Sequence, residues 1–496
     1  MSTSTYRLAP WDQAAMRGYM SVALCFPRDP ADRLTAESDI QTHIIHSLDN
    51  LSYQRPDFAG KLHVGQGKDD ESTVYLKITT GDTVPFSRLN VPFSKSYSEL
   101  ERDEFPAANF VNPEFTISAP LEVGDNPVPV AQLRILFIEG GFILFVHLHH
   151  SYADGVAFST FLELLGESTC RDYPLECLPE TRPIYTFDIL IHCDFDIFST
   201  QELATISNNP KLAEDLLAKC PEYCFNDAEN PSGPTQATFP PRHPGQTIGR
   251  TFILDTDKLD ALCAKSATGR VSRFFVLSAL AWAHTTSARI ASCLPQDRNL
   301  YTLNLPTFWN PAHWGSKGLF SGNESLNSYY GNAVAIPVTV IPNPQTLVYA
   351  CDDPSTVLAV AQEIQRANQT VDEEYVSTRT KLFCAMPDIR RLGLGLDSNP
   401  PQNFSVNTWG FLGKKAKWKF PEQLLDEDSS ADGGTAAPAV RRVQGRWSYF
   451  PHALALPSRP GVKKSEMELV VTLPEVAMEI LLKDEAWMWF VNRTTQ

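Results

Sequence analysis

One segment constrains the fold more than any other, because it joins two strand patterns to a helix pattern. Two apolar runs, Leu133–Ile138 and Phe142–Leu148, flank the pair Gly140-Gly141. Glycine adopts the backbone angles of a tight turn without a steric penalty, so this pattern predicts a β-hairpin. The apolar residues of 158–165 then recur at helical spacing. The predicted order is therefore strand, turn, strand, short loop and helix.

Patterns of both kinds alternate along the rest of the chain. We expect helices at 40–51, from about 257, and at 272–288, 355–368 and 474–482, and strands at 250–254 and 467–473. Ser272 stands before one of these helices as a candidate N-cap. Helices and strands that alternate in this way are typical of the α/β class.

The length of 496 residues predicts two or three domains, or two large ones. A proline-rich stretch between residues 226 and 244 holds five prolines, which is too many for a helix or a central strand. We therefore interpret it as a crossover linker. The expected division is an N-terminal domain at 1–225, a linker at 226–248 and a C-terminal domain at 249–496.

The composition argues against nucleic acid and membranes as binding partners. The formal net charge is −16 and there is no basic stripe, whereas a protein that binds nucleic acid or an anionic membrane normally carries one. No apolar run has the length of a membrane span, and residues 1–10 lack the apolar core of a signal peptide. The ten cysteines form no Cys-x-x-Cys pair, which is typical of free thiols in a reducing compartment. We expect a cytoplasmic protein without nucleic-acid or membrane partners.

The segment that carries chemistry runs from His149 to Gly155. His150 ends the second apolar strand, and Asp154 follows four residues later at the start of a helix. A neutral imidazole accepts a proton from an alcohol or amine near neutral pH, so His150 is the candidate general base. The chain has no Gly-x-Ser-x-Gly elbow, so no nucleophilic serine is indicated. We expect Asp154 to hold the loop, and Gly155 to adopt a backbone conformation that a Cβ would forbid.

Three histidines in four residues also raise the question of a metal site. His147 and His149 share one face of the strand, and His150 lies on the other. No cysteine or carboxylate stands nearby at ligand spacing, so the sequence favours a site without metal. For His147 we expect a structural role in the sheet.

The His150-x-x-x-Asp154-Gly155 pattern resembles the signature of the BAHD acyltransferases and of nonribosomal peptide condensation domains. Both belong to the chloramphenicol-acetyltransferase-like superfamily. Five further segments resemble BAHD motifs in the correct order: Leu8–Gln13, Asp57–Leu62, Val271–Trp282, Ser328–Ala333 and Asn407–Trp409. The chain looks most similar to the fungal branch that includes trichothecene acetyltransferases. This resemblance implies two similar α/β domains, each a mixed sheet with flanking helices, separated by a solvent channel.

The resemblance also implies roles for individual residues. His150 would be the base, and Asp154 would be structural, pairing with an arginine across the domain interface. Asn407, Thr408 and Trp409 would line the acyl site, with the Trp409 indole and the Asn407 amide donating hydrogen bonds to the tetrahedral oxyanion. A purely structural role for Trp409 as a core aromatic stays open.

The chain departs from the family pattern at two places. The expected Asp-x-Arg motif is missing, because Leu303–Pro311 contains no arginine. Asp154 must then find another donor or cap the following helix. The C-terminal Asp-Phe-Gly-Trp-Gly motif is also missing, and Lys417–Pro421 is the nearest segment.

By resemblance, the expected function is acyl-CoA-dependent acyl transfer, with acetyl-CoA as the default cosubstrate, to a small-molecule hydroxyl or amine of a fungal secondary metabolite. A monomer that needs no metal is expected. Coenzyme A phosphates require cations, and Arg273, Lys414, Lys415 and Lys417 are candidates. Two alternatives stay open: a condensation-type enzyme that takes its acyl group from a carrier protein, and a non-catalytic relative that only binds a ligand.

Overall fold

The computed structural model describes residues 2–28, 37–65, 73–118, 121, 126–170, 198–207, 209–225, 246–266, 271–293, 305–320, 329–421, 437–448 and 451–496. Most of the predicted linker, residues 226–245, lies outside the described residues. The predicted domain boundaries therefore stay a prediction.

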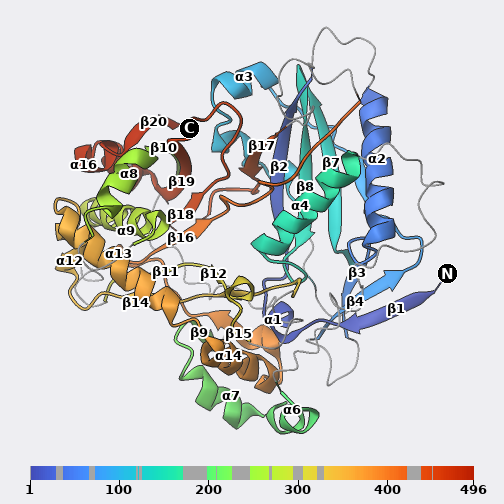
Figure 1. Cartoon of the computed structure of the whole chain (residues 1–496), viewed down its shortest axis with the longest axis horizontal. Helices are drawn as coiled ribbons and strands as arrows, with labels where there is room; N and C mark the ends of the chain where they lie inside the picture. The colour runs from blue at the N-terminus through green and yellow to red at the C-terminus, as the bar shows by residue number, and fades with distance from the viewer. Residues whose placement is uncertain are drawn as a thin grey trace.

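The first unit is a five-stranded sheet with the order β17-β2-β8-β7-β5 (Figure 1). Its strands are β2 (Tyr19–Pro27), β5 (Phe86–Arg88), β7 (Ala131–Ile138), β8 (Gly141–His149) and β17 (Ala439–Arg442). The predicted hairpin is confirmed as β7 and β8, with Gly140 at a φ of 72° in the turn. Every residue of β8 is buried, because both faces of the sheet are covered.

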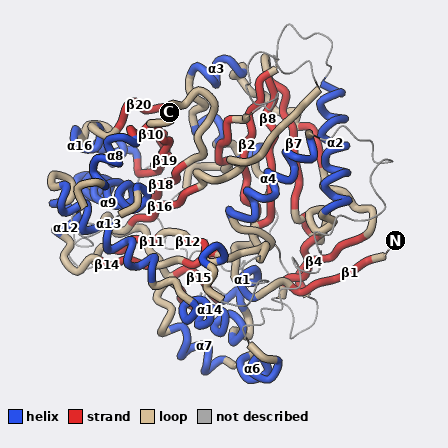
Figure 2. The backbone as a smooth tube through the Cα atoms, viewed as in Figure 1, coloured by secondary structure: helices blue, strands red, loops and turns tan. Residues whose placement is uncertain are grey.

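Helices α2 (Glu37–Gln54) and α4 (Gly155–Thr169) cover one face of this sheet, as Figure 2 shows. Both helices are predicted from their apolar spacing, and both pack against β2 and β8. Short elements cover the other face, and a small sheet with the order β1-β4-β3-β6 extends the unit. The covering elements are α3 (Tyr97–Arg102), η1 (Ala107–Phe110) and η2 (Pro113–Phe115). The strands of the small sheet are β1 (Thr3–Arg7), β3 (Lys61–Val64), β4 (Val74–Thr79) and β6 (Val128–Pro129).

The second unit is a seven-stranded sheet with the order β14-β11-β16-β18-β19-β10-β20. Its strands are β10 (Thr247–Asp255), β11 (Thr307–Trp309), β14 (Val338–Val340), β16 (Phe404–Thr408), β18 (His452–Ala455), β19 (Glu466–Pro474) and β20 (Val491–Thr495). Its helices are α8 (Thr256–Cys263), α9 (Arg273–Ser292), α12 (Gln345–Tyr349), α13 (Pro354–Gln369), α15 (Glu475–Leu481) and α16 (Glu485–Met488). The central helix α9 packs on the sheet through an almost fully buried surface. Ser272 takes the N-cap position, although its side chain makes no capping hydrogen bond.

A third apolar cluster joins the start of the chain to later segments. It contains residues of α1 (Pro10–Gln13), α6 (Thr200–Ile206), α7 (Pro210–Leu217), β9 (Tyr223–Phe225), β13 (Val334–Ala335), α14 (Glu373–Ala385), η6 (Ile389–Arg391) and β15 (Leu392–Leu394). It also contains Trp314, which lies between β12 (Ala312–His313) and η5 (Gly315–Lys317). Strands β12 and β13 pair with each other, as do β9 and β15. The predicted α/β class is confirmed.

The chain crosses between the two units after β16. The segment that replaces the missing C-terminal motif enters the core of the first unit, where Trp418 and Phe420 are buried against Phe26. The ring centroids lie 5.4 and 4.9 Å from that of Phe26. Strand β17 then pairs with β2, and β18 returns to the seven-stranded sheet. Residues late in the sequence thus complete the first sheet and its core.

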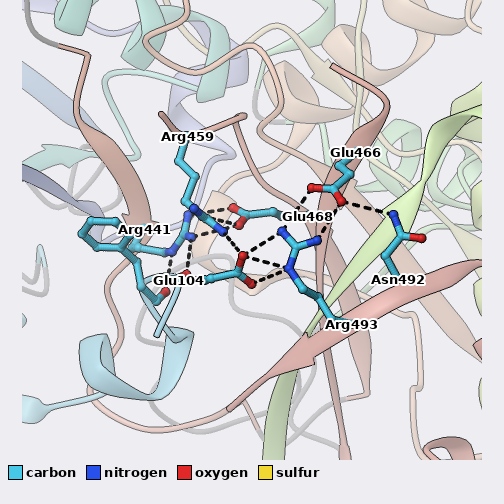
Figure 3. A network of polar contacts seen from close by, with 8 residues as sticks. Glu104, Arg441, Arg459, Glu466, Glu468, Asn492 and Arg493 are labelled. Carbon is cyan, nitrogen blue, oxygen red and sulfur yellow. Dashed lines mark hydrogen bonds and ion pairs between the residues drawn. The ribbon is translucent and has the colours of Figure 1, made fainter. Parts of the chain in front are cut away.

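A buried ion network fastens the units together near this crossing (Figure 3). Glu468 on β19 binds Arg441 of β17 at 2.9 Å and Arg459 at 2.8 Å, and all three side chains are almost fully buried. Arg459 and Arg493 also bind Glu104, which follows α3. Buried charges of this kind are costly unless each is paired.

Arg441 also holds a strained turn. Glu104 and Phe105 have φ values of 63° and 51°, in the left-handed region that non-glycine residues rarely occupy. Arg441 donates hydrogen bonds to the carbonyl oxygens of Phe105 at 2.7 Å and Glu104 at 3.1 Å. The network therefore stabilises a backbone conformation as well as the contact between units.

None of the described helices combines the length and the apolar character needed to cross a bilayer. Within the same residues, no group of three or more histidine, cysteine or acidic side chains is arranged to hold a metal ion.

Replacing Glu468 with alanine is expected to destabilise the protein by about 3–5 kcal/mol, because two buried guanidinium groups lose their shared carboxylate. Differential scanning calorimetry of the full chain measures the effect as a lower unfolding temperature. Glu363→Ala is the matched control, since it breaks the exposed Glu363–Arg366 pair and should cost less than about 1 kcal/mol. Equal shifts for the two variants would contradict the expectation.

Candidate active site

His150 is the first residue after β8 and so lies at the end of the central strand of the five-stranded sheet. Its backbone N–H donates to the carbonyl oxygen of Gly18 at 2.7 Å, and its own carbonyl oxygen accepts from Asn332 Nδ2 at 2.7 Å. The imidazole is partly exposed, whereas His147 and His149 are fully buried. Of the three histidines, only His150 is accessible to a ligand.

The two buried histidines share one face of β8, as alternation predicts. The ring of Tyr19 meets both imidazole rings edge-on, with its centroid 6.2 Å from that of His147 and 5.2 Å from that of His149. His147 Nδ1 lies 2.8 Å from Ser21 Oγ, and burial lowers the pKa of His147 to about 3. His147 is therefore neutral and structural at physiological pH, which agrees with the expectation.

Asn332 contacts the His150 ring from the second half of the chain. Its Oδ1 lies 3.0 Å from His150 Nδ1. Its Nδ2 donates to Asp12 Oδ1 at 2.9 Å as well as to the His150 carbonyl. No hydrogen-bond partner of His150 Nε2 occurs within the described part of the chain, so this nitrogen is the one open to a substrate.

Asp12 lies behind Asn332, in α1, and is almost fully buried. Its Oδ1 also accepts from the Asn332 backbone N–H at 2.8 Å, and its Oδ2 accepts from the Tyr329 hydroxyl. Burial raises the pKa of Asp12 to about 7, against the lowering effect of these hydrogen bonds, and the charge of Asp154 raises it further. Asp12 thus titrates close to neutral pH.

Asp154 caps α4 and clamps the second half of the chain. Its Oδ1 accepts from the N–H groups of Val156 and Ala157, both at 2.9 Å, and its Oδ2 accepts from the N–H of Ala333 at 3.0 Å. His313 Nε2 lies 3.6 Å from the same Oδ2. His313 therefore occupies the place across the interface where the family pattern predicts an arginine.

His313 is oriented for this contact. Its Nδ1 accepts from the Ser316 backbone N–H at 3.2 Å, so in the neutral ring the proton is on Nε2, which faces Asp154. Burial lowers the pKa of His313, and the Asp154 carboxylate opposes that shift. The interaction is a polar contact with the neutral ring, unlike the permanent charge of an arginine.

Comparison with known proteins shows what the chain is similar to. Residues 19–170, which include β8 and α4, match the trichothecene 3-O-acetyltransferase-like N-terminal domain. The acyltransferase easC of Emericella nidulans is 25% identical over 413 residues, which cover 78% of each chain. The trichothecene 3-O-acetyltransferase TRI101 of Fusarium sporotrichioides is 23% identical over 500 residues, which cover 95% of this chain and 92% of the relative.

The crystal structure of F. sporotrichioides TRI101 with coenzyme A and T-2 matches 98% of this chain and 99% of that chain, with a TM-score of 0.66 and 18% identity. This likeness confirms the expected fold of two chloramphenicol-acetyltransferase-like domains.

These matches support the predicted resemblance to the fungal BAHD acyltransferases. The roles that the BAHD resemblance implies for single residues are not tested by these matches and stay predictions.

The structure brings the Asn407–Trp409 segment toward the start of α4. Asn407 Oδ1 accepts from the Thr408 N–H at 2.7 Å, whereas Asn407 Nδ2 has no hydrogen-bond partner among the described residues. Trp409 is partly exposed, and its indole N–H has no hydrogen-bond partner in the described ranges. Two residues later, the Phe411 carbonyl accepts from Ser159 Oγ of α4 at 3.1 Å.

The expectation for Gly155 is wrong. Gly155 is the first residue of α4 and does not have a positive φ, so its backbone conformation is open to any residue. A Cβ at this position would lie 3.4 Å from Cζ of Phe411, which is an ordinary contact distance. The turn between strand and helix is instead stabilised by the Asp154 cap.

The four candidate cations lie in two separate places. Arg273, at the start of α9, is paired with Asp260 on α8 through two hydrogen bonds, one of 2.8 Å. Lys414, Lys415 and Lys417 are exposed after the Trp409 motif, and no described carboxylate pairs with them. The three lysines are therefore able to bind an anion, whereas the charge of Arg273 is already paired with Asp260.

Three residues of this site were not assigned roles from the sequence: Asp12, His313 and Asn332. Asp12 and Asn332 stand within segments that resemble BAHD motifs, which was the only available signal. His150 and Asn332 are separated by 182 positions, so no local spacing predicts their contact. His313 lies outside every segment that resembles a BAHD motif.

Replacing Asp154 is expected to lower stability in two steps. Asp154→Ala removes the cap and leaves the Ala333 N–H without a partner, at a cost of about 1 kcal/mol for the cap and about 1–3 kcal/mol for the buried donor. Asp154→Asn retains a good capping oxygen, so its unfolding temperature should lie between those of the wild type and Asp154→Ala. Calorimetry checks this order, and equal unfolding temperatures for the two variants would disprove separate contributions.

The raised pKa of Asp12 predicts a pH-dependent stability. Folding disfavours the ionised form of Asp12, so the protein is most stable while Asp12 is protonated. The contribution of Asp12 to the free energy of unfolding is intact below the unfolded-state pKa near 3.8, and it is lost as pH rises toward about 7. At about 1.4 kcal/mol per tenfold change in proton affinity, the loss is roughly 4 kcal/mol at most. Asp12→Asn cannot ionise, so its stability relative to wild type should improve between pH 5 and pH 8. If the stabilities of the wild type and Asp12→Asn change equally with pH across this range, the raised pKa of Asp12 is excluded.

Proposed function

We propose that this chain transfers an acyl group from coenzyme A to a hydroxyl or amine of a small molecule, with His150 as the general base. The observation that carries the proposal is the partly exposed imidazole of His150, which follows β8 and has one ring nitrogen hydrogen-bonded to Asn332 while Nε2 has no partner among the described residues. Acetyl is the proposed acyl group, and a hydroxyl of a secondary metabolite is the proposed acceptor. The names of the relatives support both choices.

The reaction needs one base and no covalent enzyme intermediate. His150 Nε2 takes the proton of the acceptor O–H while the acceptor oxygen attacks the thioester carbonyl carbon. The C–O bond forms, the carbonyl oxygen becomes an oxyanion, and the C–S bond then breaks. The proton on Nε2 passes to the departing sulfur, which leaves as the thiol of coenzyme A. The imidazole returns to its neutral state, ready for another turnover.

Stabilisation of the oxyanion is assigned to the segment after β16. The Trp409 indole N–H and the Asn407 side-chain amide are donors without acceptors in the described structure. This segment reaches α4 through Phe411 and Ser159, and α4 begins five residues after His150. Donors of this kind contribute most when they are preorganised in a water-poor site.

The phosphates of coenzyme A are assigned to Lys414, Lys415 and Lys417. These lysines follow the Trp409 segment directly, so a cosubstrate with its thioester near Trp409 has cations within the same stretch of chain. Arg273 is a weaker candidate, because Asp260 already neutralises it.

The proposal is tested with the purified full chain, acetyl-CoA and a panel of acceptors: a primary alcohol, a phenol, an amine and a trichothecene with a free 3-hydroxyl. Release of the coenzyme A thiol measures turnover. His150→Ala is expected to lower turnover by at least about 10²-fold, because a positioned base contributes roughly 10²–10⁴ in rate. His46→Ala is the matched control, since His46 is exposed on α2, and it should leave turnover unchanged.

Each other outcome identifies a competing function. Transfer from a pantetheine-loaded carrier protein, without transfer from any coenzyme A thioester, indicates a condensation-type enzyme. Binding of acetyl-CoA with no turnover on any acceptor, or turnover that His150→Ala leaves intact, overturns His150 as the base.

A further inference from the structure

We propose that Asn332 is a positioning residue that fixes the tautomer of His150, and that Asp12 fixes the orientation of the Asn332 amide. The function of this arrangement rests on the proposed role of His150 as a base. Its geometry does not, because it follows from hydrogen bonds between side chains. The proposal therefore has a test that is independent of activity.

The first step concerns the Asn332 amide, whose oxygen and nitrogen differ in what they can do. The nitrogen has two hydrogens to donate, and the oxygen can only accept. Two acceptors lie on the same side of the amide: Asp12 Oδ1 at 2.9 Å and the His150 carbonyl oxygen at 2.7 Å. A flipped amide would place its oxygen against both of them, which is repulsive. The nitrogen must therefore face Asp12, and Oδ1 must face the His150 ring.

The second step concerns the ring. Asn332 Oδ1 lies 3.0 Å from His150 Nδ1, and this oxygen can only accept, so Nδ1 must carry the proton. A neutral imidazole has a single N–H, so Nε2 then holds the lone pair. In the other tautomer, Nδ1 and Oδ1 would face each other as two acceptors. Nε2 has no hydrogen-bond partner among the described residues, so the arrangement places the basic lone pair on the nitrogen that can still bind a substrate.

The third step concerns Asp12, which holds Asn332 rather than His150. Asp12 Oδ1 accepts from both the backbone N–H and the side-chain amide of Asn332, at 2.8 and 2.9 Å. These two bonds fix the backbone and the side chain of one residue at the same oxygen. Both residues are almost fully buried, at 5% exposed for Asp12 and 4% for Asn332, so water does not readily replace either bond.

The direct readout is the tautomer of His150. Long-range ¹H–¹⁵N spectra of the full chain with ¹⁵N-labelled histidine distinguish a protonated from an unprotonated ring nitrogen, and the His150→Gln variant assigns the signal. The wild type is expected to show an unprotonated Nε2 at pH 8. In Asn332→Leu, which lacks the accepting oxygen, the proton should move to Nε2 in a substantial share of molecules.

The kinetic readout separates positioning from binding. Asn332→Leu is expected to lower kcat by about 10- to 100-fold with little change in KM for acetyl-CoA, because it leaves the base present but wrongly protonated and poorly held. Asp12→Ala should lower kcat in the same direction, and Asp12→Asn should recover part of the loss, because its amide oxygen can still accept from Asn332.

The matched control is Asn310→Leu. Asn310 is 2% exposed and its amide pairs with that of Asn368, with bonds of 3.0 and 2.9 Å. The variant makes the same chemical change at an equally buried amide, so it reproduces any general loss of stability. Its kcat should stay within about threefold of the wild type, and calorimetry of both leucine variants confirms that each is folded at the assay temperature.

Two results would overturn the proposal: a wild-type spectrum with the His150 proton on Nε2, or Asn332→Leu with the same tautomer and the same kcat as the wild type. Failure of the proposed function is a different result. If His150→Ala keeps full activity while the spectra show the expected tautomer and its change in Asn332→Leu, the positioning arrangement exists but His150 is not the base.

Discussion

Two buried carboxylates hold the site together. Asp12 and Asp154 come from separate parts of the N-terminal half, and they bind the adjacent backbone N–H groups of Asn332 and Ala333. These hydrogen bonds attach a strip of the second half to the turn that presents His150. Because both carboxyl groups are buried and each accepts from a backbone N–H, these two bonds determine how closely the strip approaches the imidazole. The position of the His150 ring relative to Asn332 depends on this attachment.

The same seam is supported at two further places by residues that follow β16. Trp418 and Phe420 fill the core beside Phe26, and β17 extends the first sheet. At the far end of that strand, Arg441 and Glu468 join the two sheets through a buried ion pair. The family motif that this chain lacks is thus replaced in its packing role by other aromatic residues. The missing arginine is likewise replaced by His313 near Asp154.

The elements that the sequence predicted well are those with a strong local pattern. The hairpin of β7 and β8, helix α4 and the position of His150 follow from apolar periodicity and from Gly140. The interpretation of Gly155 failed, because a glycine directly after a capping residue looks the same in sequence whether it is helical or strained. Contacts such as that of Asn332 with His150 were not predictable, because periodicity reports which face of an element is buried and not what covers it.

The sequence by itself determined the α/β class, the strand that leads into His150 and the candidate base, because each depends on side chains that are neighbours along the chain. The tertiary structure alone decided the partners of that base and of Asp154. Asn332 and His313 reach the site from the other half of the molecule. The amide, ring and carboxylate groups acquire fixed roles as donors or acceptors only when folding brings them within hydrogen-bonding distance, and that distance has no counterpart in sequence spacing.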